Sequence, residues 1–271
     1  MKIIKKCCLA ALLLTASVTA TSSIAAPFEI AVTPSRFEVA GDSGKRIAQS
    51  IELQNVGSSA TDIGLRTLDW DLAANGQVTY YDALRPNSCR EWVTLERDSI
   101  RLAPKSKKNF RFQIDIPADA PQTECRFMLA VEGIEPAHQT ILKSGGASLS
   151  LPVSGRIAVA VYVALNGAQP QLKMTQVAVK NIQGKRTPVV VVANQGNAHG
   201  RLQGSLEATD AQGNSLELNP DGTPILPGQT RTLALTATAK GSKAAALAFP
   251  LTTAGTLDWE LGSFKVDAQF K

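Results

Sequence analysis

Histidine, cysteine and aromatic residues are scarce in this sequence. The chain of 271 residues has 2 histidines and 4 cysteines, and aromatic residues make up 5% of it. Neither His138 nor His199 has a histidine, cysteine or carboxylate at the spacing of a metal site, and the sequence lacks nucleophile-elbow, Walker and dinucleotide-binding motifs. Both histidines are expected to be solvent-facing loop residues. The sequence therefore predicts no catalytic residue, metal site or cofactor, and a protein that is not an enzyme.

Long apolar runs are missing after the N-terminal segment. Three lysines in the first six residues precede an apolar run at 9–20, which is too short to span a bilayer. Residues 23–25 then form a small-x-small cleavage pattern. We interpret residues 1–25 as a signal peptide that is removed on export, with a retained N-terminal anchor as the alternative. Because no later segment is apolar over about 18 residues, the mature chain is expected to be soluble.

An excess of positive charge is also missing once the signal peptide is removed. The whole chain has 28 basic and 23 acidic residues. Losing the three lysines of the signal peptide leaves 25 basic residues, so the mature chain carries a charge near +2. A near-neutral chain gives no support for a nucleic-acid partner.

Only two cysteines, Cys89 and Cys125, remain in the mature chain. Two cysteines in an exported protein usually pair, because the compartment is oxidising. In the chain-entropy model, closing this loop would stabilise the fold by about 3–4 kcal/mol. We therefore predict a disulfide, with two buried free thiols as the alternative.

Helical periodicity is scarce as well, and short β-branched runs recur in its place. Turns rich in glycine and asparagine separate these runs, which is typical of β-sandwiches. The clearest runs lie at 47–53, 109–116, 126–131 and 188–192. The length of the mature chain suits two domains. We predict an all-β protein of two tandem immunoglobulin-like β-sandwich domains, at 26–165 and 166–271.

A weak internal repeat supports this division. Leu53-Gln-Asn55-Val-Gly57 matches Val192-Ala-Asn194-Gln-Gly196, and further along Ile100 to Pro104 matches Thr223 to Pro227. The first motif stands between two predicted strands in both copies, and the second precedes a predicted strand in both. The polar cluster at 166–170 is therefore the expected boundary between the two copies.

One alternating segment is far longer than an ordinary strand. From Leu149 to Leu165 the odd positions are apolar apart from Gly155, and the even positions are mostly small or polar. Strands usually run about five or six residues, so this segment either bends between two sheets or offers part of its edge to a partner. Pro152 has no N–H, which favours an edge or a break at that point.

Together these features resemble the PapD-like family of periplasmic pilus-assembly chaperones. The resemblance is carried by the signal peptide, the tandem sandwiches, and four segments in family order: Asn55-Val-Gly57, Leu102-Ala-Pro104, Pro117-x-x-Ala-Pro121 before Cys125, and the long alternating strand. It covers roughly residues 28–165, and the second domain is matched only by its architecture. The resemblance implies a periplasmic protein without enzymatic activity. A cysteine pair is not a general feature of that family.

What the resemblance implies is donor-strand complementation, in which a chaperone lends an alternating strand to a subunit that lacks its last strand. The positions that match the donor strand are Leu149, Leu151 and Val153, with Ile157 further along. The partners would be pilin-like subunits, with an outer-membrane usher as a further candidate. The alternative is that these residues close the protein's own sandwich, which we favour for Val159 to Leu165.

The same family anchors the subunit's terminal carboxylate between two basic residues in the cleft between the domains. Arg36 stands where the family has an arginine, whereas Ala158 stands at the place of its lysine. The nearest base on the same face is Arg156, and arginine can bind a carboxylate through two N–H groups. The resemblance therefore implies an anchor at Arg36 and, with this departure from the pattern, at Arg156.

A rival interpretation is a secreted structural or adhesive protein of a surface-appendage system. Its two sandwiches would be complete in themselves and would lend no strand. A periplasmic enzyme or enzyme accessory is a weaker alternative, because the sequence lacks the residues that such a site needs.

Overall fold

The computed structural model describes residues 28–134, 138–144, 147–153, 155–239 and 247–271; of the segments between 138 and 153 it describes the backbone. The signal peptide predicted at 1–25 lies outside the described residues. Among the described residues, every regular element is a strand apart from one short 3-10 helix, η1 (Arg90–Trp92). The all-β prediction is therefore confirmed.

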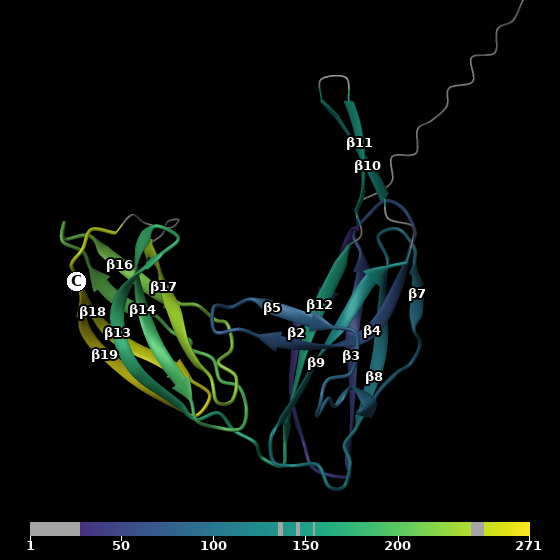
Figure 1. Ribbon diagram of the computed structural model, residues 1–271, viewed down its shortest axis with the longest axis horizontal. Helices are drawn as coiled ribbons and strands as arrows, with labels where there is room; N and C mark the ends of the chain where they lie inside the picture. The colour runs from purple at the N-terminus through teal and green to yellow at the C-terminus, as the bar shows by residue number, and fades with distance from the viewer. Residues whose placement is uncertain (1–27, 135–137, 145–146, 154, 240–246) are drawn as a thin grey trace, which may run out of the picture.

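The first domain is a sandwich of two sheets (Figure 1). One sheet has the order β1 (Ile30–Thr33), β3 (Arg46–Asn55), β8 (Lys107–Asp115) and β6 (Val93–Leu95). The other has the order β2 (Arg36–Gly41), β12 (Arg156–Leu165), β9 (Glu124–Gly133), β4 (Thr61–Leu72) and β5 (Val78–Tyr81), with β7 (Ser99–Leu102) paired to β4. Apolar residues recur with a period of two on the inner faces, so Phe110 of β8 and Phe127 of β9 are fully buried between the sheets.

A disulfide joins Cys89, just before η1, to Cys125 of β9, with their Cα atoms 6.1 Å apart. That separation is ordinary for a disulfide. Both cysteines belong to the core of the first sandwich. The predicted pairing is confirmed.

A two-stranded hairpin projects beyond the first sandwich. It consists of β10 (His138–Ser144) and β11 (Ala147–Val153), which pair only with each other within the described residues. Figure 1 shows it standing out at the end of the domain, away from the second domain. In the chain it lies between β9 and β12, which are neighbours in the sheet.

The second domain is also a sandwich, whose strands follow the order β13 (Leu172–Ile182), β14 (Lys185–Asn194), β17 (Thr230–Ala239), β16 (Ser215–Pro220), β15 (Leu206–Thr209), β18 (Leu251–Trp259) and β19 (Gly262–Phe270). The long strand β17 belongs to both sheets. Its residues 230–234 pair with β14, and its residues 235–239 pair with β16. The core between the sheets includes Leu202, Leu206, Leu233 and Phe270.

The internal repeat corresponds to the same construction in both domains. Asn55 is the last residue of β3. Its side-chain Nδ2 donates to the carbonyls of Ser59 (2.7 Å) and Ala103 (3.2 Å), and its Oδ1 accepts from the Gly57 N–H. Asn194 is the last residue of β14. Its side-chain Nδ2 donates to the carbonyls of Ala198 (2.8 Å) and Ile225 (2.8 Å), and its Oδ1 accepts from the Gly196 N–H. Each buried amide thus joins a strand end to a distant turn, which explains why the two motifs recur together.

Candidate functional site

The second half of the long alternating segment belongs to the first sandwich. β12 pairs with β9 from Arg156 to Ala164, and in parallel with β2 from Ala160 to Leu165. Its odd residues from Val159 to Leu165 are fully buried in the core, as predicted. Ile157 is half-buried and packs against the same core.

The first half forms the separate strand β11. The Cα partners of Leu149, Leu151 and Val153 are Leu142, Thr140 and His138 of β10. Within the described residues, the edge of β11 away from β10 pairs with no strand. The pairing of β12 with β2 begins only at Ala160, so its residues Arg156 to Val159 also leave one edge unpaired in the described part of the chain. A partner strand could therefore hydrogen-bond along this side of the segment.

The outer face of the same sheet turns toward the second domain. Its centre is apolar and includes Trp70 of β4, Met128 and Ala130 of β9, and Tyr162 of β12. Leu226 of the second domain packs against this cluster. The Gln229 side chain also donates a hydrogen bond to the Leu72 carbonyl, at 2.7 Å. This face is therefore where the two domains meet.

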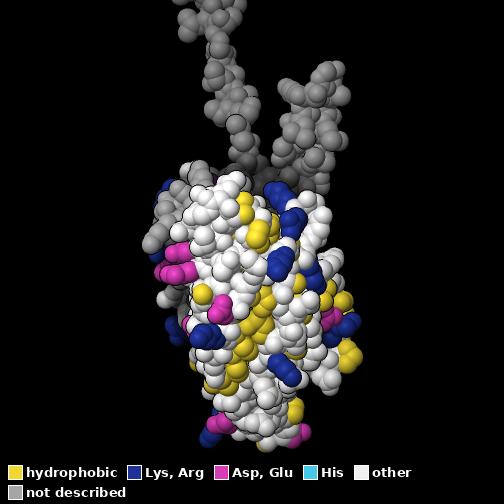
Figure 2. Space-filling model, turned by 90° about the vertical axis from the view of Figure 1, so that its left-hand side faces the viewer, with side chains coloured by type: hydrophobic (Ala, Val, Ile, Leu, Met, Phe, Trp, Pro, Cys, Tyr) yellow, Lys and Arg dark blue, Asp and Glu magenta, His cyan; other side chains and the backbone are white. Residues whose placement is uncertain are grey.

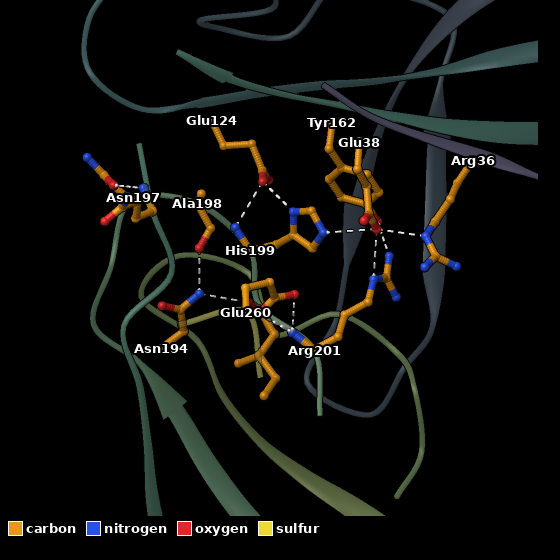
Figure 3. Close-up of polar contacts among 12 residues, drawn as sticks. Arg36, Glu38, Glu124, Tyr162, Asn194, Asn197, Ala198, His199, Arg201 and Glu260 are labelled. Atoms are coloured by element: carbon orange, nitrogen blue, oxygen red, sulfur yellow. Dashed lines mark hydrogen bonds and ion pairs between the residues drawn. The ribbon is translucent and has the colours of Figure 1, made fainter. Parts of the chain in front are cut away.

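Glu38 lies at one side of this interface and collects donors from both domains (Figure 3). Its Oε1 accepts from Arg36 Nε at 2.7 Å in its own domain. The same oxygen accepts from Arg201 Nε at 3.2 Å and lies 3.4 Å from His199 Nε2, both in the second domain. The hydrogen bond from His199, together with the bond and charge of Arg36 and the charge of Arg201, lowers the pKa of Glu38 to about 2 despite its partial burial. Three donors from two domains thus converge on one carboxylate oxygen of the chain itself.

His199 is buried in the interface rather than exposed. Its backbone N–H donates to Glu124 Oε2 at 2.9 Å, and its Nδ1 pairs with the same oxygen. Its ring stacks on Tyr162, with the ring centroids 3.9 Å apart. Burial disfavours the imidazolium, but the hydrogen bonds to Glu124 and Glu38 outweigh it and raise the pKa of His199. The prediction of a solvent-facing histidine is wrong, because the residues that bury it come from the other domain.

Arg156 belongs to a different cluster from Arg36. It pairs with Glu132 of β9, whose carboxylate also accepts two 3.0 Å hydrogen bonds from Arg66 of β4. The β12 partner of Arg36 is Ala160, four residues beyond Arg156, so the two arginines are separated by about 13 Å along the strand. The structure does not bring Arg36 and Arg156 together. The base that faces Arg36 is Arg201, which nothing in the sequence pattern singled out.

The described part of the chain contains no helix long and apolar enough to cross a membrane. Nor do the described residues include a group of three or more side chains that could hold a metal ion.

No protein-family model matches this sequence. No curated protein matches it either. Among solved structures, the chain is similar to the YadV chaperone, with 13% identity, a TM-score of 0.47, and coverage of 89% of this chain and 99% of that one. It is similar to a structure of the Salmonella enterica SafA pilin in complex with the SafB chaperone, with 13% identity, a TM-score of 0.46, and coverage of 90% and 98%. The E. coli chaperone DraB is similar at 12% identity, with a TM-score of 0.45 and coverage of 90% and 100%.

Proposed function

We propose that this chain is a periplasmic chaperone that binds pilus or fimbrial subunits by lending them a strand. The observation that carries the proposal is the edge of β11 that pairs with no strand in the described part of the chain, on a hairpin that projects beyond the sandwich. Backbone groups on such an edge form a new ladder with any chain that lacks a strand, and alternate side chains supply specificity. Leu149, Leu151 and Val153 stand at alternate positions of this strand.

The donated segment is β11 rather than β12. The apolar side chains of β12 already fill the first core, so lending them would expose that core to water. Ile157 packs against this core and marks the end of the donated part. Burying three apolar side chains in a subunit would contribute roughly 1.5–3 kcal/mol each.

The subunit's terminal carboxylate is proposed to bind between Arg36 and Arg201. Both donate to one oxygen of Glu38, at 2.7 and 3.2 Å, so their guanidinium groups already converge on a carboxylate. An incoming carboxylate would take the place of Glu38 or share its donors. Arg156, paired with Glu132 elsewhere on the sheet, is the less suitable base.

The test is to tag the protein in its own periplasm and identify the proteins that copurify. Wild type should recover small β-rich subunits, and Leu151→Glu should lose them because it places a charge among apolar contacts. Ser150→Glu is the matched control, since it adds the same charge at the neighbouring position of the strand. Recovery of the free protein alone, with unchanged subunit levels in a deletion strain, would favour the complete structural or adhesive protein instead.

A further inference from the structure

A cavity of about 650 Å³ lies in the first domain between the end of β4, the segment 85–92 and the start of β9. β4 and β9 pair as far as Leu68 and Met128, although β4 continues to Leu72 and β9 begins at Glu124. The two strands thus separate within the sheet, and the cavity lies where they part. Its volume is within the range of small-molecule sites, roughly 300–1,000 Å³.

The walls of this cavity are held in place on both sides. Asp69 of β4 is buried and accepts hydrogen bonds from the Arg85 backbone N–H at 3.0 Å and from the Ser88 hydroxyl at 2.8 Å. The disulfide joins Cys89 of the same segment to Cys125 at the start of β9. The segment 85–92 is therefore tied to both strands, and the cavity is preformed, as ligand sites usually are.

Three buried polar atoms of the lining residues have no hydrogen-bond partner among the residues that the structure describes. They are Trp70 Nε1, Glu124 Oε1 and Arg126 Nε. Trp70 is 5% exposed and Glu124 is 7% exposed. Buried polar groups are nearly always hydrogen-bonded, because an unpaired group loses its contacts with water and gains none in return. The cavity wall therefore offers two donors and one acceptor to a ligand.

The surface of the second domain shows a different kind of feature. Figure 2 shows an apolar stripe on the outward face of that domain. Apolar residues at the margin of the second core, such as Val177 and Phe264, are half-buried and already pack against that core. Exposed apolar surface is normal in a folded domain, whereas buried polar atoms without partners are not. The cavity is therefore the stronger candidate for a ligand site.

Arg126 is the base of the cavity wall whose charge is not paired. Asp69 pairs with Arg90 and Asp71 pairs with Arg85, each at 3.3 Å. The ion pairs found among the described residues include none with Arg126. An anionic group in the cavity would supply the missing partner.

The positions of Arg126, Trp70 and Glu124 favour a ligand with two charged ends. The Arg126 guanidinium carbon lies 5.7 Å from the centroid of the Trp70 ring, so one carboxylate can accept from the guanidinium and from the indole N–H. Glu124 and Arg126 are two residues apart on β9, so they share a face with Cα atoms about 7 Å apart. An extended dipeptide, at about 3.3–3.6 Å per residue, spans that distance between its ends.

We propose that this cavity binds a short peptide with free ends, of the size of a dipeptide. Its carboxylate binds Arg126 and Trp70 Nε1, and its ammonium group donates to Glu124 Oε1. Its side chains are apolar, to match the apolar part of the lining, which consists of Pro86, Trp92, Pro121 and Leu165. The site is separate from β11 and from the two arginines that contact Glu38, so it does not depend on the proposed chaperone function.

The test is isothermal titration calorimetry of the purified mature protein with L-leucyl-L-leucine. Wild type should bind this dipeptide about tenfold more tightly than its C-terminal amide, which has no carboxylate. The N-acetyl form, which has no ammonium group, should be weakened to a similar extent. L-leucine should also bind more weakly than the dipeptide, because its two charged groups stand on one carbon.

Two variants identify the residues that bind the carboxylate. Arg126→Gln should remove the difference between the dipeptide and its amide. Trp70→Phe keeps an aromatic ring without the N–H and should weaken dipeptide binding severalfold. Arg111→Gln, the same change at an exposed position of β8, is the matched control and should keep the full difference. Comparing two ligands within one variant separates a lost contact from a change in folding.

The proposal is overturned if wild type binds the dipeptide and its amide equally, if Arg111→Gln has the same effect as Arg126→Gln, or if wild type binds no dipeptide. L-leucine bound as tightly as the dipeptide would also contradict it, because the two charged ends would then need no separation. Since no pilus subunit takes part in this experiment, a negative result leaves the proposed chaperone function to its own test with Leu151→Glu.

Discussion

His199 and Glu124 join the two domains through a buried pair of titratable groups. The Glu124 side chain is 1% exposed and the His199 side chain is 8% exposed, so neither is solvated well enough to carry a charge alone. Glu38 and Arg201 surround the pair, and Tyr162 covers the imidazole ring. The contact between the domains at this side therefore includes a histidine that is buried beside two carboxylates.

The raised pKa of His199 predicts that stability depends on pH. A group whose folded pKa exceeds its ordinary value of 6.5 adds stability that is complete below 6.5 and disappears as pH rises through the folded pKa. The free energy of unfolding should thus fall as pH rises above 6.5, and His199→Gln should lack this fall. Urea unfolding across this pH range measures it. A wild-type curve parallel to that of His199→Gln would contradict the assignment.

The side-chain amide of Asn194 joins the end of β14 to two turns, and its removal should lower the free energy of unfolding. Asn194→Ala removes the donor of the buried Ala198 carbonyl and one of the two donors of the Ile225 carbonyl, which keeps the Gly200 N–H. We expect a loss of about 2–4 kcal/mol in the free energy of unfolding, measured by urea denaturation. Asn194→Asp keeps the acceptor but not the donor, so a stability equal to wild type in that variant would show that the Nδ2 bonds are unimportant.

Residues whose surroundings are local were predictable from the sequence, and those that depend on the other domain were not. The repeated Asn-x-Gly motif predicted a matching turn in both domains, and in each the asparagine amide closes its own turn. Arg36 was found through the family resemblance. His199 and Arg201 were missed because the groups around them, Glu38, Glu124 and Tyr162, are distant in the sequence.

At the scale of elements, the period of two identified the strand segment but not its break. A Cβ atom at Gly155 would come within 2.1 Å of Phe28 Cγ, so the backbone passes close to that ring between β11 and β12. The register also changes there, because Arg156 faces Glu132 whereas Val153 faces His138. Alternation continues through such a break, and the sequence therefore shows one long strand where the structure has two.

The disulfide should stabilise the first domain, because it restricts the unfolded chain between Cys89 and Cys125. It closes a loop of 36 residues that includes η1, β6, β7 and β8. Replacing both Cys89 and Cys125 with alanine should lower the free energy of unfolding by about 3–4 kcal/mol. The check is urea unfolding of the double variant against wild type under oxidising conditions, where an unchanged midpoint would contradict the prediction.

At the scale of the whole molecule, the two domains meet through a face that is apolar at its centre and charged at one side. Leu226 packs on the apolar centre. At the charged side, Arg201 contacts Glu38 and His199 contacts Glu124. Composition and the internal repeat were enough to predict two sandwiches. They could not predict this interface, because its residues follow no period within either domain.

The proposed carboxylate site spans that interface, so three substitutions distinguish its members. Arg36→Ala and Arg201→Ala should each lower the amount of subunit recovered in periplasmic copurification several-fold, by roughly 1–2 kcal/mol of lost charged hydrogen bonding. Arg156→Ala should have a smaller effect, because Arg156 pairs with Glu132. If only Arg156→Ala lost the subunit, Arg156 would be the residue that binds the subunit's terminal carboxylate, and the proposed pair of Arg36 and Arg201 would be wrong.

The central claim is that β11 is lent to a subunit, and amide hydrogen exchange tests it most directly. The exchange of residues 147–153 is compared in the free protein and in the complex purified from the periplasm. We expect strong protection of these amides in the complex, because a free edge becomes a paired one, while the amides of β12 from Ala160 onward change little. Unchanged exchange at 147–153 in a complex that protects other segments would contradict it.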